Sequence, residues 1–266
     1  MPFFVLENDG NSTSPQIDLV VSDNKATQLI VAVHPPKELP LRLGVLIDAS
    51  NSERRSSLYG PEVQAASELL NETVKTPENK VFIGRFDVTA DVSAFMNRDE
   101  LLKFKIELTP GGGTALQDAI YLACKERMQR DPTQPARRVL VVLSDGDDNM
   151  SRFTREEAIA MAQKTGTVIF IVGTSEGLNG NVVSRRLEQL ADNTGGQAFF
   201  PFNNKDIPKV FTSIKEQIEA LYAVTFVPAA PGKPGKYHSI ELKTTSDKKA
   251  KLRAPKGYYY ATTAAQ

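Results

Sequence analysis

The run LGVLID at residues 43–48 decides the fold, because it is an apolar segment that ends abruptly in an aspartate. The runs VLVVLS at 139–144 and TVIFIV at 167–172 have the same character, and KVFIGRF at 80–86 is similar. Short, nearly continuous apolar runs are typical of parallel strands that are buried on both faces of a sheet. We therefore expect these four segments to form the centre of a parallel sheet.

Segments with helical periodicity lie between and after these strands. Apolar residues recur every three or four positions near residues 63–74, 116–128, 154–161, 183–191 and 207–221. Thr154 and Glu157 form a capping box at the start of the third segment, and a glycine pair at 195–196 ends the fourth. This alternation predicts a doubly wound α/β domain over residues 41–222, with helices on both faces of a mostly parallel sheet.

The two ends of the chain have β character instead. Alternating or β-rich segments occur at residues 16–21, 28–33, 223–227, 237–243 and 250–253. Neither end has enough apolar residues for a stable sheet of its own. We therefore expect residues 1–40 and 223–266 to pair in a small antiparallel sheet beside the α/β domain.

The composition excludes several classes of function. The 266 residues include 32 basic and 32 acidic side chains, so the net charge of zero gives no overall attraction to nucleic acid or to an anionic membrane. The longest apolar runs are far shorter than the roughly 20 residues that cross a bilayer, so no membrane insertion is expected. The N-terminus lacks the features of a signal peptide. This fits a cytoplasmic protein, and equally a secreted or periplasmic one whose export signal is not in this sequence.

Cysteine and histidine are too scarce for most metal or redox sites. A single cysteine, Cys124, excludes an intrachain disulfide, and its place on an apolar helix face predicts packing rather than reactivity. The two histidines, His34 and His238, cannot make a three-imidazole site. Any bound metal must therefore be held mostly by oxygen ligands.

Oxygen ligands are concentrated where strands end. Asp48 ends the first central strand and is followed by Ser50 and Ser52, while Asp145 directly follows the strand at 139–144. Thr114 follows a glycine run at 111–113, which we expect to bend the chain and present the threonine. In open α/β sheets, ligands bind outside the carboxyl ends of the strands. Two carboxylates and three hydroxyls at that edge suit Mg²⁺, Mn²⁺ or Ca²⁺ and leave room for an acidic ligand from outside.

This set of five residues resembles the metal-ion-dependent adhesion site of von Willebrand factor type A (vWA) domains. The resemblance implies that Ser50, Ser52 and Thr114 ligate the metal directly, and that Asp48 and Asp145 act largely through bound waters. It also implies a non-enzymatic, adhesion-type module in which the metal coordinates a Glu or Asp of a protein partner.

The flanks of the α/β domain are similar to the acidobacterial-type vWA-related family. The similar segments are Leu-Pro-Leu at 39–41, Ser-Asp-Gly-Asp-Asp-Asn at 144–149 and Lys-Gly-Tyr at 256–258. Asp147 and Asp148 in the second segment are expected to form an acidic rim of the metal site or to face solvent.

Two other classes of function remain open. The segment Gly-Thr-Ser-Glu-Gly at 173–177 fits a nucleophile elbow, so Ser175 could serve a hydrolase with His238 as its base. Against this, the following residues look like loop rather than helix, and His238 alternates within a strand, where a surface position is expected. The third hypothesis is a cation-independent assembly module that uses the small antiparallel sheet of the two chain ends as its contact surface.

Overall fold

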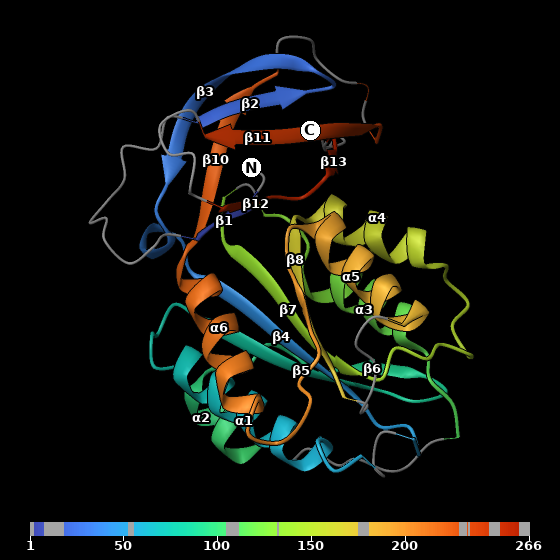
Figure 1. Ribbon diagram of the computed structural model, residues 1–266. Helices are drawn as coiled ribbons and strands as arrows, with labels where there is room; N and C mark the ends of the chain where they lie inside the picture. Colours follow the sequence, from blue (N-terminus) through green and yellow to red (C-terminus); the bar gives the residue numbers. More distant parts are fainter. Residues whose placement is uncertain are drawn as a thin grey trace.

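The computed structural model describes residues 3–7, 19–52, 56–104, 112–131, 133–174, 181–228, 233, 235–244 and 251–260. Two sheets dominate it, one above the other in Figure 1. The lower, central sheet belongs to an α/β unit. The upper sheet, which we call the terminal sheet, combines strands from both ends of the chain.

The central sheet has six strands in the order β6-β5-β4-β7-β8-β9. These are β4 (Leu41–Asp48), β5 (Lys80–Phe86), β6 (Ala90–Val92), β7 (Arg137–Ser144), β8 (Thr167–Gly173) and β9 (Ala198–Phe199). All neighbouring pairs are parallel except β5 and β6. Residues of β4, β7 and β8 are almost all buried, as expected for strands covered on both faces. The predicted doubly wound, mostly parallel sheet is thus confirmed.

Helices cover both faces of the central sheet (Figure 1). One face packs against α1 (Tyr59–Thr73), α2 (Arg98–Lys103) and α6 (Ile207–Glu219), and the other against α3 (Leu116–Arg127), α4 (Arg155–Thr165) and α5 (Val182–Thr194). Alternate residues of β4 divide between the two cores: Val45 lies in the first and Leu46 in the second. The predicted capping box between Thr154 and Glu157 is present at the start of α4.

The terminal sheet has seven antiparallel strands in the order β12-β1-β10-β3-β2-β11-β13. They are β1 (Phe3–Glu7), β2 (Leu19–Asp23), β3 (Ala26–His34), β10 (Leu221–Val227), β11 (Tyr237–Thr244), β12 (Lys251–Arg253) and β13 (Gly257–Tyr259). Strands from the two ends of the chain pair directly, β10 with both β1 and β3, and β11 with β2. The expected pairing of the two ends is therefore seen. Whether they fold as a unit separate from residues 41–222 stays a prediction.

The terminal sheet joins the central sheet at the amino ends of its strands. Strand β3 leads through the short helix η1 (Pro36–Glu38) into Leu41, the first residue of β4. The side chain of Arg137, at the start of β7, donates to the carbonyl of Leu39 at 3.0 Å and to that of Ile218 at 2.9 Å. The carboxyl ends of the central strands consequently lie at the opposite end of the molecule (Figure 1).

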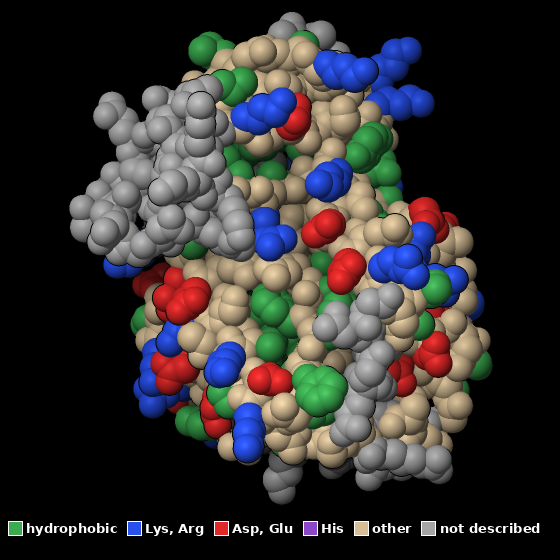
Figure 2. All heavy atoms as spheres, in the orientation of Figure 1, with side chains coloured by type: hydrophobic (Ala, Val, Ile, Leu, Met, Phe, Trp, Pro, Cys, Tyr) green, Lys and Arg blue, Asp and Glu red, His purple; other side chains and the backbone are tan. Residues whose placement is uncertain are grey.

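On the face shown in Figure 2, acidic and basic side chains are interspersed over the α/β unit, whereas basic side chains predominate over the terminal sheet. The net charge of zero is therefore an average over the two parts of the molecule. Among the described residues, no helix is both long enough and apolar enough to cross a bilayer.

Candidate functional site

The candidate site lies where β4 and β7 end side by side. These strands are parallel neighbours in a register that pairs Ile47 with Leu143, so Asp48 and Ser144 come next at the same edge. The chain goes from β4 to β5 on one side of β4 and later places β7 on its other side. The gap between β4 and β7 is therefore the switch point of the sheet, where ligands of α/β folds bind.

Asp48 is the most buried acid of this edge, with 0% of its surface exposed. Its Oδ1 accepts a hydrogen bond from the backbone N–H of Ser50 at 2.9 Å, and its Oδ2 accepts one from the hydroxyl of Ser144, also at 2.9 Å. Burial raises the pKa of Asp48 to about 6, and the nearby charge of Asp145 adds to the rise, although the donors from Ser50 and Ser144 oppose it. Asp48 therefore has neutral donors around it and a second acid close by.

The two serines after Asp48 bring their hydroxyls together. The Oγ atoms of Ser50 and Ser52 are 3.1 Å apart. Ser50 is buried, whereas Ser52 is exposed, so the hydroxyl pair leads from the buried carboxylate toward the surface.

Asp145 comes from the neighbouring strand end and is 8% exposed. Its Oδ1 accepts a hydrogen bond from the backbone N–H of Asp147 at 3.1 Å, which holds the turn after β7. Gly146 makes this turn possible because its φ of 82° suits glycine and because a Cβ there would meet Val183 at 2.6 Å. Asp145 is thereby fixed at the edge beside Ser144.

Thr114 is held against the same loop from the side of α3, and 2% of it is exposed. Its backbone N–H donates to Oδ1 of Asn149 at 3.0 Å, and its carbonyl accepts from the N–H groups of Asn149 and Met150, both at 3.1 Å. A Cβ on Gly113 would collide with the side chain of Met150. Within the described part of the glycine run, the small residue thus allows a close approach between two loops.

One acid at this edge has a different role from the one expected. Asp148 does not form a free acidic rim: its Oδ2 accepts hydrogen bonds from the backbone N–H of Gln117 and the hydroxyl of Ser151, both at 2.8 Å. It therefore satisfies the first turn of α3, which needs acceptors for its free N–H groups. Asp147 is exposed, as expected.

No basic side chain neutralises the two carboxylates within the described residues, where neither Asp48 nor Asp145 forms an ion pair. The same part of the chain has no group of three or more His, Cys, Asp or Glu side chains that could hold a metal. A metal at this edge would therefore depend on the serine and threonine hydroxyls as well as the two acids.

Two residues that the sequence analysis did not single out belong to this edge. Ser144 donates to Asp48 and Asn149 accepts from Thr114, so each connects two of the loops. Ser144 could have been found from its place as the last residue of an apolar strand, directly before Asp145. Nothing in the local sequence marks Asn149, because its partner is 35 residues away.

The residues of the hydrolase hypothesis are only partly described. Ser175 lies outside the described residues. His238 is on β11 of the terminal sheet, at the amino end of the central strands. It is 9% exposed rather than on the surface as expected, and its Nδ1 is 2.9 Å from Oδ1 of Asp23. His238 is thus engaged by an acid of its own sheet.

Cys124 is packed rather than reactive, as its helical position indicated. It is fully buried in the core beside Ile120 and Met128. Burial raises the pKa of its thiol to about 12, so the thiol is protonated at neutral pH.

These features define a class of protein: a doubly wound α/β domain with acids and hydroxyls gathered at the switch point of its sheet. The sequence model of the von Willebrand factor type A domain matches residues 44–217, which is more than half of the chain and lies within the predicted range 41–222. The chain therefore belongs to the von Willebrand factor type A domain family. Domains of this family often serve as protein-interaction or adhesion modules and are generally not enzymes.

Solved structures support the fold. Proximal thread matrix protein 1 from the mussel byssus aligns with a TM-score of 0.53 and 15% identity, over 73% of this chain and 49% of that chain. The PilB minor pilin from Streptococcus sanguinis gives 0.51 and 17%, over 68% and 62% of the two chains. An aerotolerance-related membrane protein from Bacteroides fragilis gives 0.50 and 17%, over 67% and 98%.

The metal ligands, the acidic ligand of a partner and the closer family similarity all stay predictions after these comparisons. A comparison with curated proteins gives no match. At identities of 15–17%, the structural likeness extends to the fold alone. The closer similarity to the acidobacterial-type vWA-related family stays a prediction.

Proposed function

We propose that this protein is a divalent-cation-dependent protein-binding module, in which a metal at the carboxyl edge of the central sheet coordinates an acidic residue of a partner. The observation that carries the proposal is the pair of buried acids, Asp48 and Asp145, which no basic side chain of the described residues neutralises. Buried like charges are unfavourable unless a cation compensates them.

The donor set fits a hard cation. Its proposed ligands, direct or through water, are Asp48, Ser50, Ser52, Thr114 and Asp145, all of which supply oxygen. Two carboxylates balance a dication, and the hydroxyls add ligands without adding charge. When bound, the cation would supply an electrophilic centre that accepts a further oxygen ligand.

The chemistry of the donors fits any of three hard cations, Mg²⁺, Mn²⁺ or Ca²⁺, because all three take carboxylate and hydroxyl oxygens. Ser50 and Ser52 would hold such an ion through hydroxyls that already lie side by side, with their Oγ atoms 3.1 Å apart.

The chain's own residues would hold the metal ligands in position and would not take part in a reaction. Ser144 and the backbone N–H of Ser50 fix the carboxylate of Asp48, and Asn149 fixes the backbone of Thr114. Because two of the five proposed ligands are acids, a dication is balanced and a partner's carboxylate can add its charge without excess negative repulsion. The loops that surround this edge would then determine which partner is accepted.

The metal part of the proposal is tested by calorimetric titration of the full chain with Mg²⁺, Mn²⁺ and Ca²⁺. Thr114→Val removes the hydroxyl but keeps the shape, and Thr114→Ser is its matched control because it keeps the hydroxyl. We expect cation binding in the wild type and in Thr114→Ser, and at least a tenfold loss of affinity in Thr114→Val, since loss of a residue that merely supports a metal ligand already costs about 10–100-fold. Equal affinities in all three would contradict the assigned ligands.

The partner part is tested with a blocked Gly-Glu-Gly peptide and its Gly-Gln-Gly counterpart. We expect the glutamate peptide alone to bind, only with the cation present, and not after addition of EDTA. Binding of both peptides, or binding that survives EDTA, would contradict coordination of an acid. If association with protein partners did not depend on the cation, the hypothesis of an assembly module would be favoured instead.

A further inference from the structure

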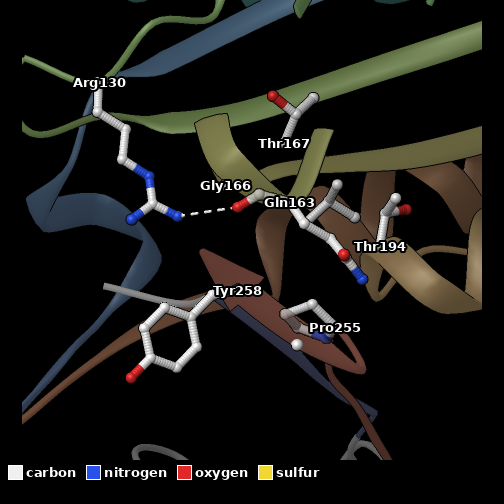
Figure 3. Close-up of a pocket in the computed structure, with 9 residues that line it drawn as sticks. Arg130, Gln163, Gly166, Thr167, Thr194, Pro255 and Tyr258 are labelled. Carbon is white, nitrogen blue, oxygen red and sulfur yellow. Dashed lines mark hydrogen bonds between the residues drawn. The ribbon is translucent and has the colours of Figure 1, made fainter. Parts of the chain in front are cut away.

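The terminal sheet and the α/β unit meet along a seam that contains two hollows. The smaller one, about 10 Å³, is lined by Arg130, whose guanidinium donates to the carbonyl of Gln163 at 3.3 Å, and by Pro255 and Tyr258 (Figure 3). It has room for about one water molecule. The larger hollow shares Gln163 with it and measures about 340 Å³, which is within the range of small-molecule sites.

Both units contribute walls to this larger hollow, which we call the seam pocket. Its residues come from α4, α5, β11 and β13: Arg155, Glu156, Ile159, Ala160, Gln163, Gln189, Asn193, Tyr237 and Tyr259. The seam is held rigidly there. The side chain of Gln163 donates to the carbonyl of Asn193 at 2.9 Å, and the same carbonyl accepts from the N–H of Lys256 at 3.2 Å. Ligand sites occur preferentially at such junctions between units.

Two tyrosines supply an aromatic corner. The ring centroids of Tyr237 and Tyr259 are 5.5 Å apart and their planes are inclined by 64°. The ammonium of Lys164 lies 5.1 Å from the centroid of Tyr259 and so engages that ring. Tyr237 is 46% exposed, although its hydroxyl donates to the carbonyl of Lys256 at 3.2 Å. An immobilised ring with an accessible surface can receive the apolar face of a ligand with little loss of entropy.

The remaining walls combine the apolar side chains of Ile159 and Ala160 with an ion pair and three amides. Arg155 and Glu156 pair with each other, with 3.0 Å between Nη2 and Oε1. The amide nitrogens of Gln163 and Asn193 already donate to the carbonyls of Asn193 and Gln189, at 2.9 and 2.7 Å, so a ligand would meet their amide oxygens and the side chain of Gln189. These walls favour a neutral ligand with many hydroxyl groups over a phosphate or a carboxylate.

We infer that the seam pocket binds a neutral saccharide, with the C–H face of one pyranose ring on Tyr237 and its hydroxyls toward the amides of α4 and α5. A pyranose combines an apolar face with a rim of hydroxyls that both donate and accept, which matches an aromatic corner beside amide groups. A proline-rich peptide also seeks exposed tyrosines, but its binding would leave the amide wall without partners. This site is independent of the metal proposed at the opposite end of the molecule.

The test is a titration of the full chain, enriched in ¹⁵N, with methyl hexopyranosides of glucose, galactose, mannose and N-acetylglucosamine, followed by NMR. We expect at least one glycoside to shift the side-chain amide signals of Gln189 and Asn193. Methyl glucuronide and a proline-rich decapeptide are the contrasting probes, and neither should match the affinity of the best neutral glycoside.

Three variants locate the binding. Tyr237→Ala should weaken it about tenfold, in line with the stacking energy of one ring, whereas Tyr237→Phe should leave it within a factor of about three. Gln189→Ala should weaken it without unfolding, since Gln189 is exposed, and Gln64→Ala on α1 is the matched control that should change nothing. The inference is overturned if no neutral glycoside shifts these amides, if Gln189→Ala and Tyr237→Ala both bind like the wild type, or if the decapeptide binds more tightly.

Discussion

Two buried aspartates lie at opposite ends of this molecule and have opposite surroundings. Asp23, at the end of β2, is 5% exposed and has two side-chain partners within the chain: Nδ1 of His238 is 2.9 Å from its Oδ1, and the hydroxyl of Tyr258 donates to its Oδ2 at 2.7 Å. Asp48, at the end of β4, is 0% exposed, and its bonded partners are a serine hydroxyl and a backbone N–H.

The difference separates a structural acid from a functional one. Burial and the hydrogen bond to Asp23 raise the pKa of Tyr258 above its usual range, so the phenol remains a donor to the carboxylate. Asp23 thus needs nothing from outside the chain. Asp48 instead has a second acid beside it and no basic partner among the described residues. Its charge calls for a cation, which is the basis of the proposed function.

The largest effect on stability is expected from Asp23→Ala. Removal of this carboxylate leaves the buried imidazole of His238 and the half-buried hydroxyl of Tyr258 without their acceptor, so the free energy of unfolding should fall by about 1–3 kcal/mol. Tyr258→Phe, which removes one hydrogen bond, should lower it by about 1 kcal/mol. Chemical denaturation measures both. If Asp23→Ala were as stable as the wild type, Asp23 would not hold the terminal sheet together.

A smaller effect of opposite sign is expected from Asp48→Asn without divalent cations. The amide keeps an acceptor for the N–H of Ser50 and removes a buried charge beside Asp145, so the free energy of unfolding in EDTA should rise, on the order of 1 kcal/mol. Denaturation at pH 7.5 measures it, with Asp23→Asn as the matched substitution, which should destabilise. Loss of stability in both variants would show that both carboxylates stabilise the fold, and would contradict the proposed difference between Asp23 and Asp48.

No chemical labelling of the native protein is expected at a third buried acidic group, the thiol of Cys124. Its pKa of about 12 shows that a buried acid can avoid charge by keeping its proton. The native protein at pH 8 should therefore not react with a thiol-specific reagent such as iodoacetamide, and should react once unfolded in guanidinium chloride. Mass spectrometry measures the modification. Rapid labelling of the native protein would show that this core admits solvent.

The four long strands of the central sheet could be predicted from sequence because each of them carries its own signal. The runs at 43–48 and 139–144 are apolar throughout, and the helix at 155–165 has a capping box that depends on residues three apart. Strands β6 and β9 were missed because segments of three and two residues are too short to show a period. Helix α2 was missed for the same reason, although Asn97 and Glu100 form a capping box.

Individual side-chain contacts in the terminal sheet and in the site could not be predicted, because no local pattern records them. His238 looked like a surface residue because its partner Asp23 is 215 positions away. Asp148 looked like a free acid because the helix turn that it satisfies begins 31 residues earlier. It was easier to single out Asp48, Ser50 and Ser52, because they lie together at the end of one apolar strand. Their use as metal ligands stays a proposal.

The most direct test of the central account is the effect of Mg²⁺ on unfolding of the wild type and of Ser52→Ala. Ser52 is exposed and contacts Ser50 through its hydroxyl, so the variant should fold normally. With Mg²⁺ at a hundred times its dissociation constant, the free energy of unfolding of the wild type should rise by about 2.7 kcal/mol over its value in EDTA. At the same Mg²⁺ concentration the rise should be much smaller in Ser52→Ala, and unchanged in Tyr258→Phe at the other end of the molecule. No rise in the wild type, or an equal rise in Ser52→Ala, would contradict a cation site at this edge.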